Sequence, residues 1–266
     1  MRVADALGAS GLDAREARLL LAEASGFSQA SLIAYPEREL PGEVAARFED
    51  WARRRRDGEP VAYLVGHREF YGLDLAVNPA VLIPRPETEL LVEWALERAP
   101  ASVLDLGTGS GAIALAIRSR LPQARVVAVD ASAAALVVAK RNGVKLGLAV
   151  DWRHGRWFEP VAGERFDLVV SNPPYVAEGD HHLDEGDVRQ EPRSALVSGP
   201  DGLDALRELA QAAPEFLAPG GALLLEHGLG QDAAVRVMLE RCGFASVQSR
   251  LDLAGIARAT GGTLES

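Results

Sequence analysis

The sequence predicts an α/β protein in which a parallel sheet, covered by helices on both faces, follows a small helical domain. From residue 87 onward, short apolar segments alternate with segments of helical periodicity. The apolar segments are nearly continuous, as expected of strands buried on both faces of a parallel sheet. Residues 1–57 contain helical patterns only, and the turn-rich residues 58–86 separate the two parts.

Residues 1–57 are expected to form a helical bundle. Asp13 is a suitable N-cap for a first helix, and Gly26 is a suitable stop. Pro41 and Gly58 bracket another helix, because proline suits a first helical turn and glycine suits the position after the last. Its apolar residues recur at i, i+4, i+7 and i+8, which indicates a buried face. They are Val44, Phe48, Trp51 and Ala52.

Residues 58–86 mix β-branched and aromatic residues with glycine and proline turn signals. They predict a short β-hairpin, then a loop ordered by proline, that together link two domains. The expected organisation is therefore a helical domain over 1–57, a hairpin linker over 58–86 and a larger domain over 87–266.

The larger domain is expected to alternate strands with helices. The expected strands cover 102–107, 124–130, 166–174 and 220–228. The expected helices cover 87–99, 111–121, 132–144, 201–217 and 231–243. Residues 244–262 contain two weak strands around a turn, which could form an antiparallel edge of the sheet.

Composition narrows the function classes. The chain has 266 residues, of which 48% are hydrophobic and 25% charged, as in soluble globular proteins. Its net charge of −10 disfavours a broad surface for nucleic-acid phosphates. The single cysteine, Cys242, excludes an internal disulfide framework and a Cys-cluster zinc site. No apolar run suits a membrane span, and the N-terminus lacks the pattern of a secretory signal, so the cytoplasm is the expected location.

A glycine-rich loop follows the first expected strand of the larger domain. Gly107, Thr108, Gly109, Ser110 and Gly111 form G-x-G-x-G, which differs from the G-x-G-x-x-G of dinucleotide enzymes and disfavours a nicotinamide dehydrogenase. Glycines allow the backbone to approach a ligand closely, although a tight turn without a ligand is the alternative.

An acidic residue, Asp130, ends the next expected strand. Its carboxylate could accept hydrogen bonds from both ribose hydroxyls of an adenosine-containing ligand. Asp130 and Ser132 are also both suitable N-caps for the helix that follows.

Asn172, Pro173, Pro174 and Tyr175 follow the apolar segment 166–171, at the same edge of the sheet as the glycine loop. The prolines stiffen the backbone and leave its carbonyls free to accept hydrogen bonds. Asn172 adds an acceptor and Tyr175 an aromatic face. Together they suit the recognition of a planar NH₂ group, whereas a proline turn that merely stops the strand is the alternative.

These motifs resemble those of methyltransferases that use S-adenosylmethionine to modify planar nitrogens. The segments IPRPETELLVE, DLGTGSGAIALA, VSNPPY, GDVRQEPRSAL and LLLEHG resemble those of the glutamine N5-methyltransferases of peptide chain release factors, the PrmC or HemK family. The resemblance covers residues 59–245. It implies a Rossmann-like class I methyltransferase domain with a seven-stranded, mostly parallel sheet.

The resemblance also implies a cofactor, a substrate and residue roles. The loop from Gly107 to Gly111, Asp130, Trp157, Phe158 and Asn172 would bind S-adenosyl-L-methionine, leaving S-adenosyl-L-homocysteine as product. Residues 172–175 would hold the glutamine of the Gly-Gly-Gln motif in a class 1 release factor, with Asn172, Pro173 and Tyr175 as catalytic residues. The N-terminal domain would help to hold the release factor. Arg156 departs from the family pattern, which has an acidic residue before this tryptophan.

The implied reaction needs alignment of nitrogen, methyl and sulfur more than it needs a general base. We expect the Asn172 side-chain oxygen and the Pro173 carbonyl to accept hydrogen bonds from the two N–H groups of the amide. The Tyr175 ring is expected to pack on the plane of the amide.

A ribosomal-protein glutamine and a nucleic-acid amino group are alternative substrates. A non-catalytic binding protein is a further alternative. The chain is expected to be a monomer without a stable nucleic-acid complex.

Other polar groups allow two interpretations. Arg53–Arg56 form either a solvated helix end or a contact to ribosomal RNA or an acidic partner. Asp180, His181, His182 and Asp184 are expected to lie in an exposed loop rather than to bind a metal. Glu87 and Glu89, near Arg85, are expected either at the seam between the two domains or at the amino acid end of the cofactor. Glu191 and Arg193 could shape the entrance for the substrate.

Overall fold

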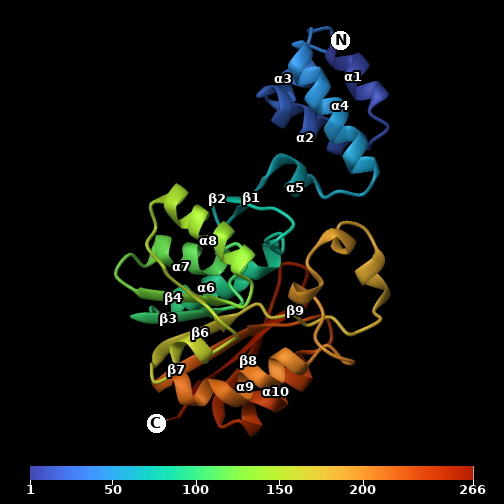
Figure 1. Ribbon diagram of the computed structural model, residues 1–266. Helices are drawn as coiled ribbons and strands as arrows, with labels where there is room; N and C mark the ends of the chain where they lie inside the picture. The colour runs from blue at the N-terminus through green and yellow to red at the C-terminus, as the bar shows by residue number, and fades with distance from the viewer. Residues whose placement is uncertain (266) are drawn as a thin grey trace. The chain divides into compact units, whose positions relative to one another are not determined.

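The computed structural model describes residues 1–265, and its contacts divide them into two compact units (Figure 1). The first unit contains Met1–His67 together with Asp184–Gln190. The second contains Arg68–Leu183 and the residues from Glu191 onward.

The first unit is helical, as predicted for residues 1–57. Its helices are α1 (Val3–Ala9), α2 (Ala14–Ser25), α3 (Gln29–Ala34), α4 (Gly42–Arg56) and α5 (Val61–Val65). The Asp13 side chain caps α2 by accepting from the Arg15 N–H at 2.8 Å, and Gly26 ends that helix with a φ of 73°. Leu20, Leu21 and Phe48 fill the core of the unit.

The four arginines at the end of α4 are all engaged within the first unit. Arg53 pairs with Asp50, and Arg54 pairs with Glu59, both at 2.5 Å. Arg55 bridges Glu16 and Asp187, and Arg56 donates to the Ser10 carbonyl. Arg55 and Arg56 therefore link α4 to α2, to the loop at Ser10 and to the segment 184–190, whereas Arg53 and Arg54 make only local pairs.

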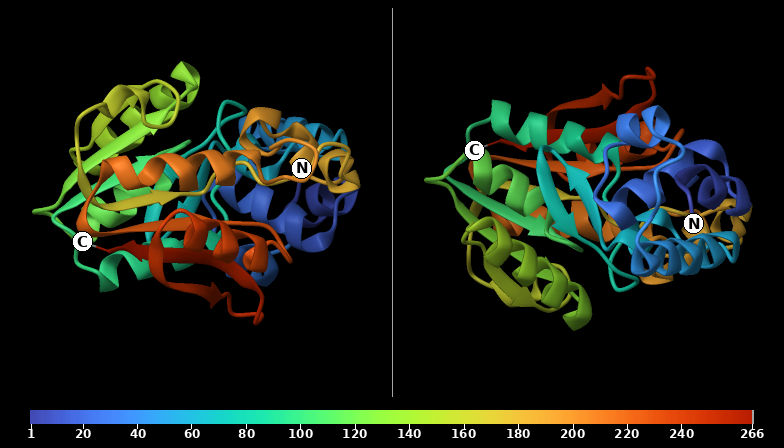
Figure 2. Two further views of the ribbon diagram at one scale, coloured as in Figure 1. Left: turned by 90° about the horizontal axis from the view of Figure 1, so that it is seen from below. Right: turned by 90° about the horizontal axis from the view of Figure 1, so that it is seen from above.

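The second unit contains the seven-stranded sheet, in the order β5-β4-β3-β6-β7-β9-β8. The strands are β3 (Ser102–Leu106), β4 (Arg125–Asp130), β5 (Asp151–His154), β6 (Phe166–Ser171), β7 (Leu217–Glu226), β8 (Phe244–Leu251) and β9 (Ala257–Leu264). Strands β3 to β7 pair in parallel, whereas β9 is antiparallel to β7 and β8. The α/β class and the antiparallel edge are confirmed. In both views of Figure 2, β8 and β9 (red) lie at the opposite edge of the sheet from β5 (yellow-green).

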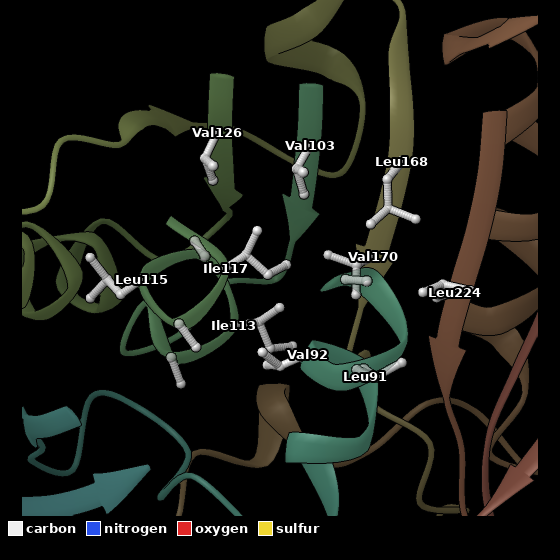
Figure 3. Close-up of a cluster of buried hydrophobic side chains, with 14 of the residues drawn as sticks. Leu91, Val92, Val103, Ile113, Leu115, Ile117, Val126, Leu168, Val170 and Leu224 are labelled. Atoms are coloured by element: carbon white, nitrogen blue, oxygen red, sulfur yellow. The ribbon is translucent and has the colours of Figure 1, made fainter. Parts of the chain in front are cut away.

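The helices of the second unit cover both faces of this sheet. They are α6 (Glu89–Glu97), α7 (Ala112–Arg120), α8 (Ala133–Leu146), α9 (Asp204–Phe216) and α10 (Asp232–Arg241). On one face, Ile113 and Ile117 of α7 and Val92 of α6 pack toward the sheet residues Val103 and Val170 (Figure 3). A second core, on the other face, joins α9 and α10 to the alternate residues of the same strands. Burial on both faces explains why the strands are so apolar.

Two elements differ from the expectation. Residues 61–65, expected in a β-rich linker, form helix α5, which Pro60 begins and Gly66 ends in the left-handed conformation. The hairpin that follows is short, with β1 (His67–Phe70) and β2 (Leu73–Ala76). Strand β5 was not expected, because its sequence DWRH is polar.

Gly261 of β9 gives a test of how closely the sheet packs against α6. A Cβ there would lie 2.7 Å from the Leu223 carbonyl oxygen and 3.0 Å from the Trp94 ring. The backbone oxygen cannot rotate away, so Gly261→Ala should lower the free energy of unfolding by about 1–3 kcal/mol. The control is Gly8→Ala in α1, where a Cβ meets nothing within 4 Å. Equal stability of the two variants in denaturant unfolding would contradict the prediction.

Candidate active site

The site lies at the carboxyl ends of the parallel strands of the second unit. Leu106, the last residue of β3, pairs with Val129 of β4 on one side and with Ser171 of β6 on the other. The three loops that follow these strands therefore meet at one edge, where ligands of such sheets bind. They surround a cavity of about 420 Å³.

Six of the residues predicted from the sequence line this cavity. They are Gly107, Gly109, Asp130, Trp157, Asn172 and Pro174. Residues 79–82 and the segment with Pro192, Ser194 and Ala195 form two further walls, and the remaining lining residues are Val129, Ala131, Ser132, Ala135 and Arg156. The structure thus brings together the glycine loop, the acidic residue and the start of the NPPY segment.

The glycine loop turns sharply through left-handed conformations. Gly107, Gly109 and Gly111 have φ values of 72°, 57° and 84°, which side chains with a Cβ rarely adopt. The N–H groups of Gly107 and Thr108 donate to the Val129 carbonyl at 2.9 and 3.0 Å. Nothing lies within 4 Å of a Cβ built on Gly109, so this part of the loop is open.

The other loop residues face inward and do not line the cavity. The Thr108 hydroxyl donates to Asp105 Oδ2 at 2.6 Å, and Ser110 is buried. A Cβ on Gly111 would meet the Trp152 ring at 2.9 Å, so this glycine serves close packing at the start of α7. Thr108, Ser110 and Gly111 therefore stabilise the conformation of the loop through contacts with the protein interior.

Two carboxyl groups lie at the loop. Asp130 Oδ2 accepts from the Gly109 N–H and Oδ1 from the Ser132 N–H, both at 2.8 Å, while Ser132 is the N-cap of α8. Burial raises the pKa of Asp130. Asp105 is fully buried beneath the loop, and burial raises its pKa to about 7. Its Oδ1 has no hydrogen-bond partner among residues 1–265.

The side chains of the adjacent residues Trp157 and Phe158 lie in different surroundings. Trp157 lines the cavity, and its ring is 3.4 Å from the Cβ position of Gly107. Phe158 points into the core and stacks on Phe216. Glu208 of α9 accepts from the Trp157 indole N–H at 3.1 Å and forms a two-point ion pair with Arg156. Glu208 therefore holds both Arg156 and Trp157 from α9.

Asn172 is held by a neighbour that sequence analysis did not single out. Its Nδ2 donates to the Thr88 hydroxyl at 3.1 Å. Pro174 lines the cavity beside it, whereas Pro173 is buried. Tyr175 does not line the cavity. Its hydroxyl donates to Glu226 Oε1 at 3.1 Å, so its predicted packing on a substrate amide stays a prediction.

Asn142 also shapes the site and was not identified from the sequence, whereas Glu191 was named there with its role left open. Asn142 of α8 is fully buried and donates from Nδ2 to the Ala76 and Ser110 carbonyls, at 3.0 and 2.9 Å. The sequence contained a signal for this role, namely an asparagine on an otherwise apolar helix face. Such an asparagine is expected to be buried, and a buried amide needs hydrogen-bond partners. Glu191, also buried, accepts from the Ile83 N–H at 3.2 Å and pairs with Arg85. Through Ile83 and Arg85, Glu191 therefore connects two segments that line the cavity, residues 79–82 and residues 192–195.

Two further observations concern the loop of residues 180–182 and the length of the helices. The possible ligand atoms of Asp180, His181 and His182 lie within 4.8 Å of one another, and both histidines are exposed. Among residues 1–265, no helix combines the length and apolar character that a bilayer span requires.

Comparisons with known proteins agree with this geometry. A family model described as "Methyltransferase small domain" matches residues 86–188, and one described as "PrmC N-terminal domain" matches residues 2–66. A "Release factor glutamine methyltransferase" of Burkholderia pseudomallei is 52% identical, covering 98% of this chain and 95% of that protein. A protein of the same name from Neisseria gonorrhoeae is 50% identical, covering 96% and 94%.

Solved structures support the fold. A methyltransferase from Pyrococcus furiosus matches 73% of this chain and 90% of its own, with a TM-score of 0.57 and 19% identity. A Thermus thermophilus 16S rRNA N2 G1207 methyltransferase, solved with AdoMet and guanosine, matches 75% of this chain and 50% of its own, with a TM-score of 0.55 and 23% identity.

Proposed function

The chain belongs to the family of release factor glutamine methyltransferases, and on this premise we propose which reaction its site performs. The protein transfers a methyl group from S-adenosylmethionine to the side-chain amide nitrogen, N5, of the glutamine in the Gly-Gly-Gln motif of a peptide chain release factor. One observation supports this assignment above the others. The glycine loop, the acidic residue and the asparagine of NPPY line a single cavity.

The residues around the cavity fit the cofactor. Its volume of about 420 Å³ is within the usual range for small-molecule sites. Each oxygen of Asp130 accepts one backbone N–H and keeps a further lone pair for a ribose hydroxyl. The open Gly109 admits a ligand close to the backbone, and the Trp157 ring offers a flat apolar wall.

When bound, S-adenosylmethionine supplies a methyl group on an electrophilic sulfonium. An amide nitrogen is a weak nucleophile, because its lone pair is delocalised into the carbonyl. The task of the protein is therefore to align the nitrogen, and alignment can contribute about 7–11 kcal/mol in favourable cases. The proton leaves the amide nitrogen after the transfer.

Asn172 and Pro173 hold the substrate amide in this proposal. With Nδ2 of Asn172 bound to Thr88, its Oδ1 is left to accept from one substrate N–H. The Pro173 carbonyl accepts from the other, on a backbone stiffened by two prolines. Two acceptors on one NH₂ group raise the electron density on its nitrogen. Pro174 contributes to the apolar wall beside them.

The partner and the domain roles belong to the same proposal. The match of residues 2–66 to the PrmC N-terminal domain supports the assignment of residues 1–57 to release-factor recognition. Residues 58–86 then act as linker and residues 87–266 as the catalytic domain, apart from the segment 184–190, which belongs to the first unit. A release factor is a cytoplasmic partner, so the enzyme acts in the cytoplasm.

The proposal is tested by mapping a labelled methyl group. The protein is mixed with methyl-labelled S-adenosylmethionine and a release factor, with a Gln→Ala variant of the Gly-Gly-Gln motif as control. We expect label on that glutamine, located by mass spectrometry, and none on the control. Label on a ribosomal protein or on DNA instead would keep the chemistry but reject the substrate. The absence of any cofactor binding in calorimetry would reject the enzyme assignment.

A further inference from the structure

Two walls of the cavity are connected through one buried side chain, Asn142 of α8. Its Oδ1 accepts from the Ala76 N–H at 2.7 Å, and its Nδ2 donates to the Ala76 carbonyl at 3.0 Å and to the Ser110 carbonyl at 2.9 Å. Ala76 ends strand β2 of the hairpin, whereas Ser110 belongs to the glycine loop. One amide, which is fully buried, therefore joins the hairpin to the loop that we assign to the cofactor.

The three bonds fix the orientation of the Asn142 amide. An amide side chain has one acceptor oxygen and an NH₂ group with two hydrogens. Both hydrogens are used on the two carbonyls, and the oxygen meets the Ala76 N–H. A reversed amide would bring its oxygen against the Ala76 and Ser110 carbonyl oxygens. Neither aspartate nor leucine, the side chains closest in size and shape, offers this combination of donors and acceptor.

The bond to Ser110 holds one side of the open part of the glycine loop. On the other side, the Thr108 N–H donates to the Val129 carbonyl of β4 at 3.0 Å. Gly109, which lies between these two anchors, lines the cavity and has open space at its Cβ position. Asn142 thus fixes the part of the loop that a ligand can approach most closely.

The bonds to Ala76 hold a second wall of the cavity. The chain continues from Ala76 through the buried Val77 to residues 79–82, which line the cavity. Asn78 orders the turn between them, since its Oδ1 accepts from the Ala80 N–H at 2.9 Å. Because the turn is ordered internally, its place in the cavity depends on the residues that anchor its ends.

We propose that Asn142 is a positioning residue for S-adenosylmethionine, which holds the glycine loop and residues 79–82 at the separation that the cofactor requires. The cavity lining, as described for residues 1–265, does not include Asn142, so it acts through Ala76 and Ser110. If the two walls moved independently, only a fraction of the molecules would present both at once, and the Kd would rise by the inverse of that fraction. The inference rests on the proposed function for the identity of the ligand.

Asn142→Ala tests the proposal by removing all three bonds. We expect the Kd for S-adenosylmethionine, measured by calorimetry, to rise at least about tenfold. Lys145→Ala is the matched control on the same helix. It removes the bonds of the ammonium group to the Asp74 carboxylate and carbonyl in the hairpin, at 2.7 and 2.9 Å, but leaves the bond to Ser110 in place. Its Kd should stay within about twofold of the wild type, and equal increases in the two variants would overturn the proposal.

Gly261→Ala controls for a general loss of stability. Its expected destabilisation comes from the contact of a Cβ with the Leu223 carbonyl oxygen in the sheet. The affinities are compared at a temperature where every variant is folded, and the Kd of Gly261→Ala should stay within about twofold of the wild type. If it weakened binding as much as Asn142→Ala at a similar loss of stability, Asn142 would have only a structural role and the proposal would fail.

Asn142→Asp separates the partners of the amide. The carboxyl group can still accept from the Ala76 N–H, but it has at most one hydrogen, when protonated, for the two carbonyls. We therefore expect the Kd for S-adenosylmethionine to rise about as much as in Asn142→Ala. Affinity equal to that of the wild type would show that the bond to the Ser110 carbonyl does not position the loop, which would overturn the inference.

A measurement on the unaltered protein avoids any dependence on how a variant folds. Backbone hydrogen exchange, followed by NMR, compares the Ala76 N–H with the Tyr71 N–H of the same hairpin, which donates to Glu89 Oε1 at 2.9 Å. Saturation with S-adenosylmethionine should slow exchange at Ala76 at least about fivefold more than at Tyr71, because the cofactor and Asn142 hold the same loop. Equal slowing would overturn the inference. Selective slowing at Ala76 in a protein that fails to methylate release factors would retain the inference and reject the proposed substrate.

Discussion

Replacing Asn172 by alanine is expected to lower the rate of methyl transfer at least about 100-fold, the scale seen when one preorganised hydrogen-bonding group is removed from an active site. The variant loses an acceptor for the substrate N–H and the alignment that it provides. The loss should fall on kcat, because the glycine loop and Asp130, which we assign to the cofactor, keep their own contacts. Single-turnover methylation and calorimetry with S-adenosylmethionine measure the two quantities separately.

Ser171→Ala is the matched control for this variant. Ser171 directly precedes Asn172, is buried, and donates its hydroxyl to the Leu106 carbonyl at 2.7 Å. Its loss should cost about 1 kcal/mol of stability and leave the reaction rate nearly unchanged. Comparable losses of rate and of cofactor affinity in Asn172→Ala would contradict the proposed division of roles.

The parts of the fold that follow from local pattern were predictable. Strands β3, β4 and β6 are apolar because both their faces are covered, and glycines or caps mark the helices between them. Strand β5 has no such signal, since it lies at the sheet edge and is defined by its pairing with β4. Helix α5 has the composition of a strand, but Ala62 and Leu64 are buried in the helical conformation.

The site was predictable to the extent that it depends on strand ends. Gly107, Asp130 and Asn172 were identified because each comes at or just after an apolar segment, and parallel strands present these ends at one edge. The residues that orient them were not identifiable in this way. Thr88, Glu208 and Glu226 contact the site from distant parts of the chain, and their contacts depend on tertiary packing.

Replacing Asp130 by alanine is expected to weaken the binding of S-adenosylmethionine about 10- to 100-fold, the range for losing hydrogen bonds to a charged group. Two effects combine. The ribose hydroxyls lose their acceptor, and the N–H groups of Gly109 and Ser132 lose theirs, so the loop that approaches the cofactor loses an anchor. Stability should change less, because removing a buried charge offsets part of the lost bonds. Calorimetry gives the affinity and thermal unfolding the stability.

Asp167→Ala separates cofactor binding from the general effect of losing a carboxylate. Asp167 Oδ2 accepts from the Ser102 N–H at 2.8 Å and from its hydroxyl at 3.0 Å, near the amino ends of β3 and β6. It thus resembles Asp130 in its bonds but lies at the opposite end of the strands. Its removal should lower stability and leave cofactor affinity unchanged. If both variants weakened binding equally, the role of Asp130 would be to support the sheet and not to hold the ribose.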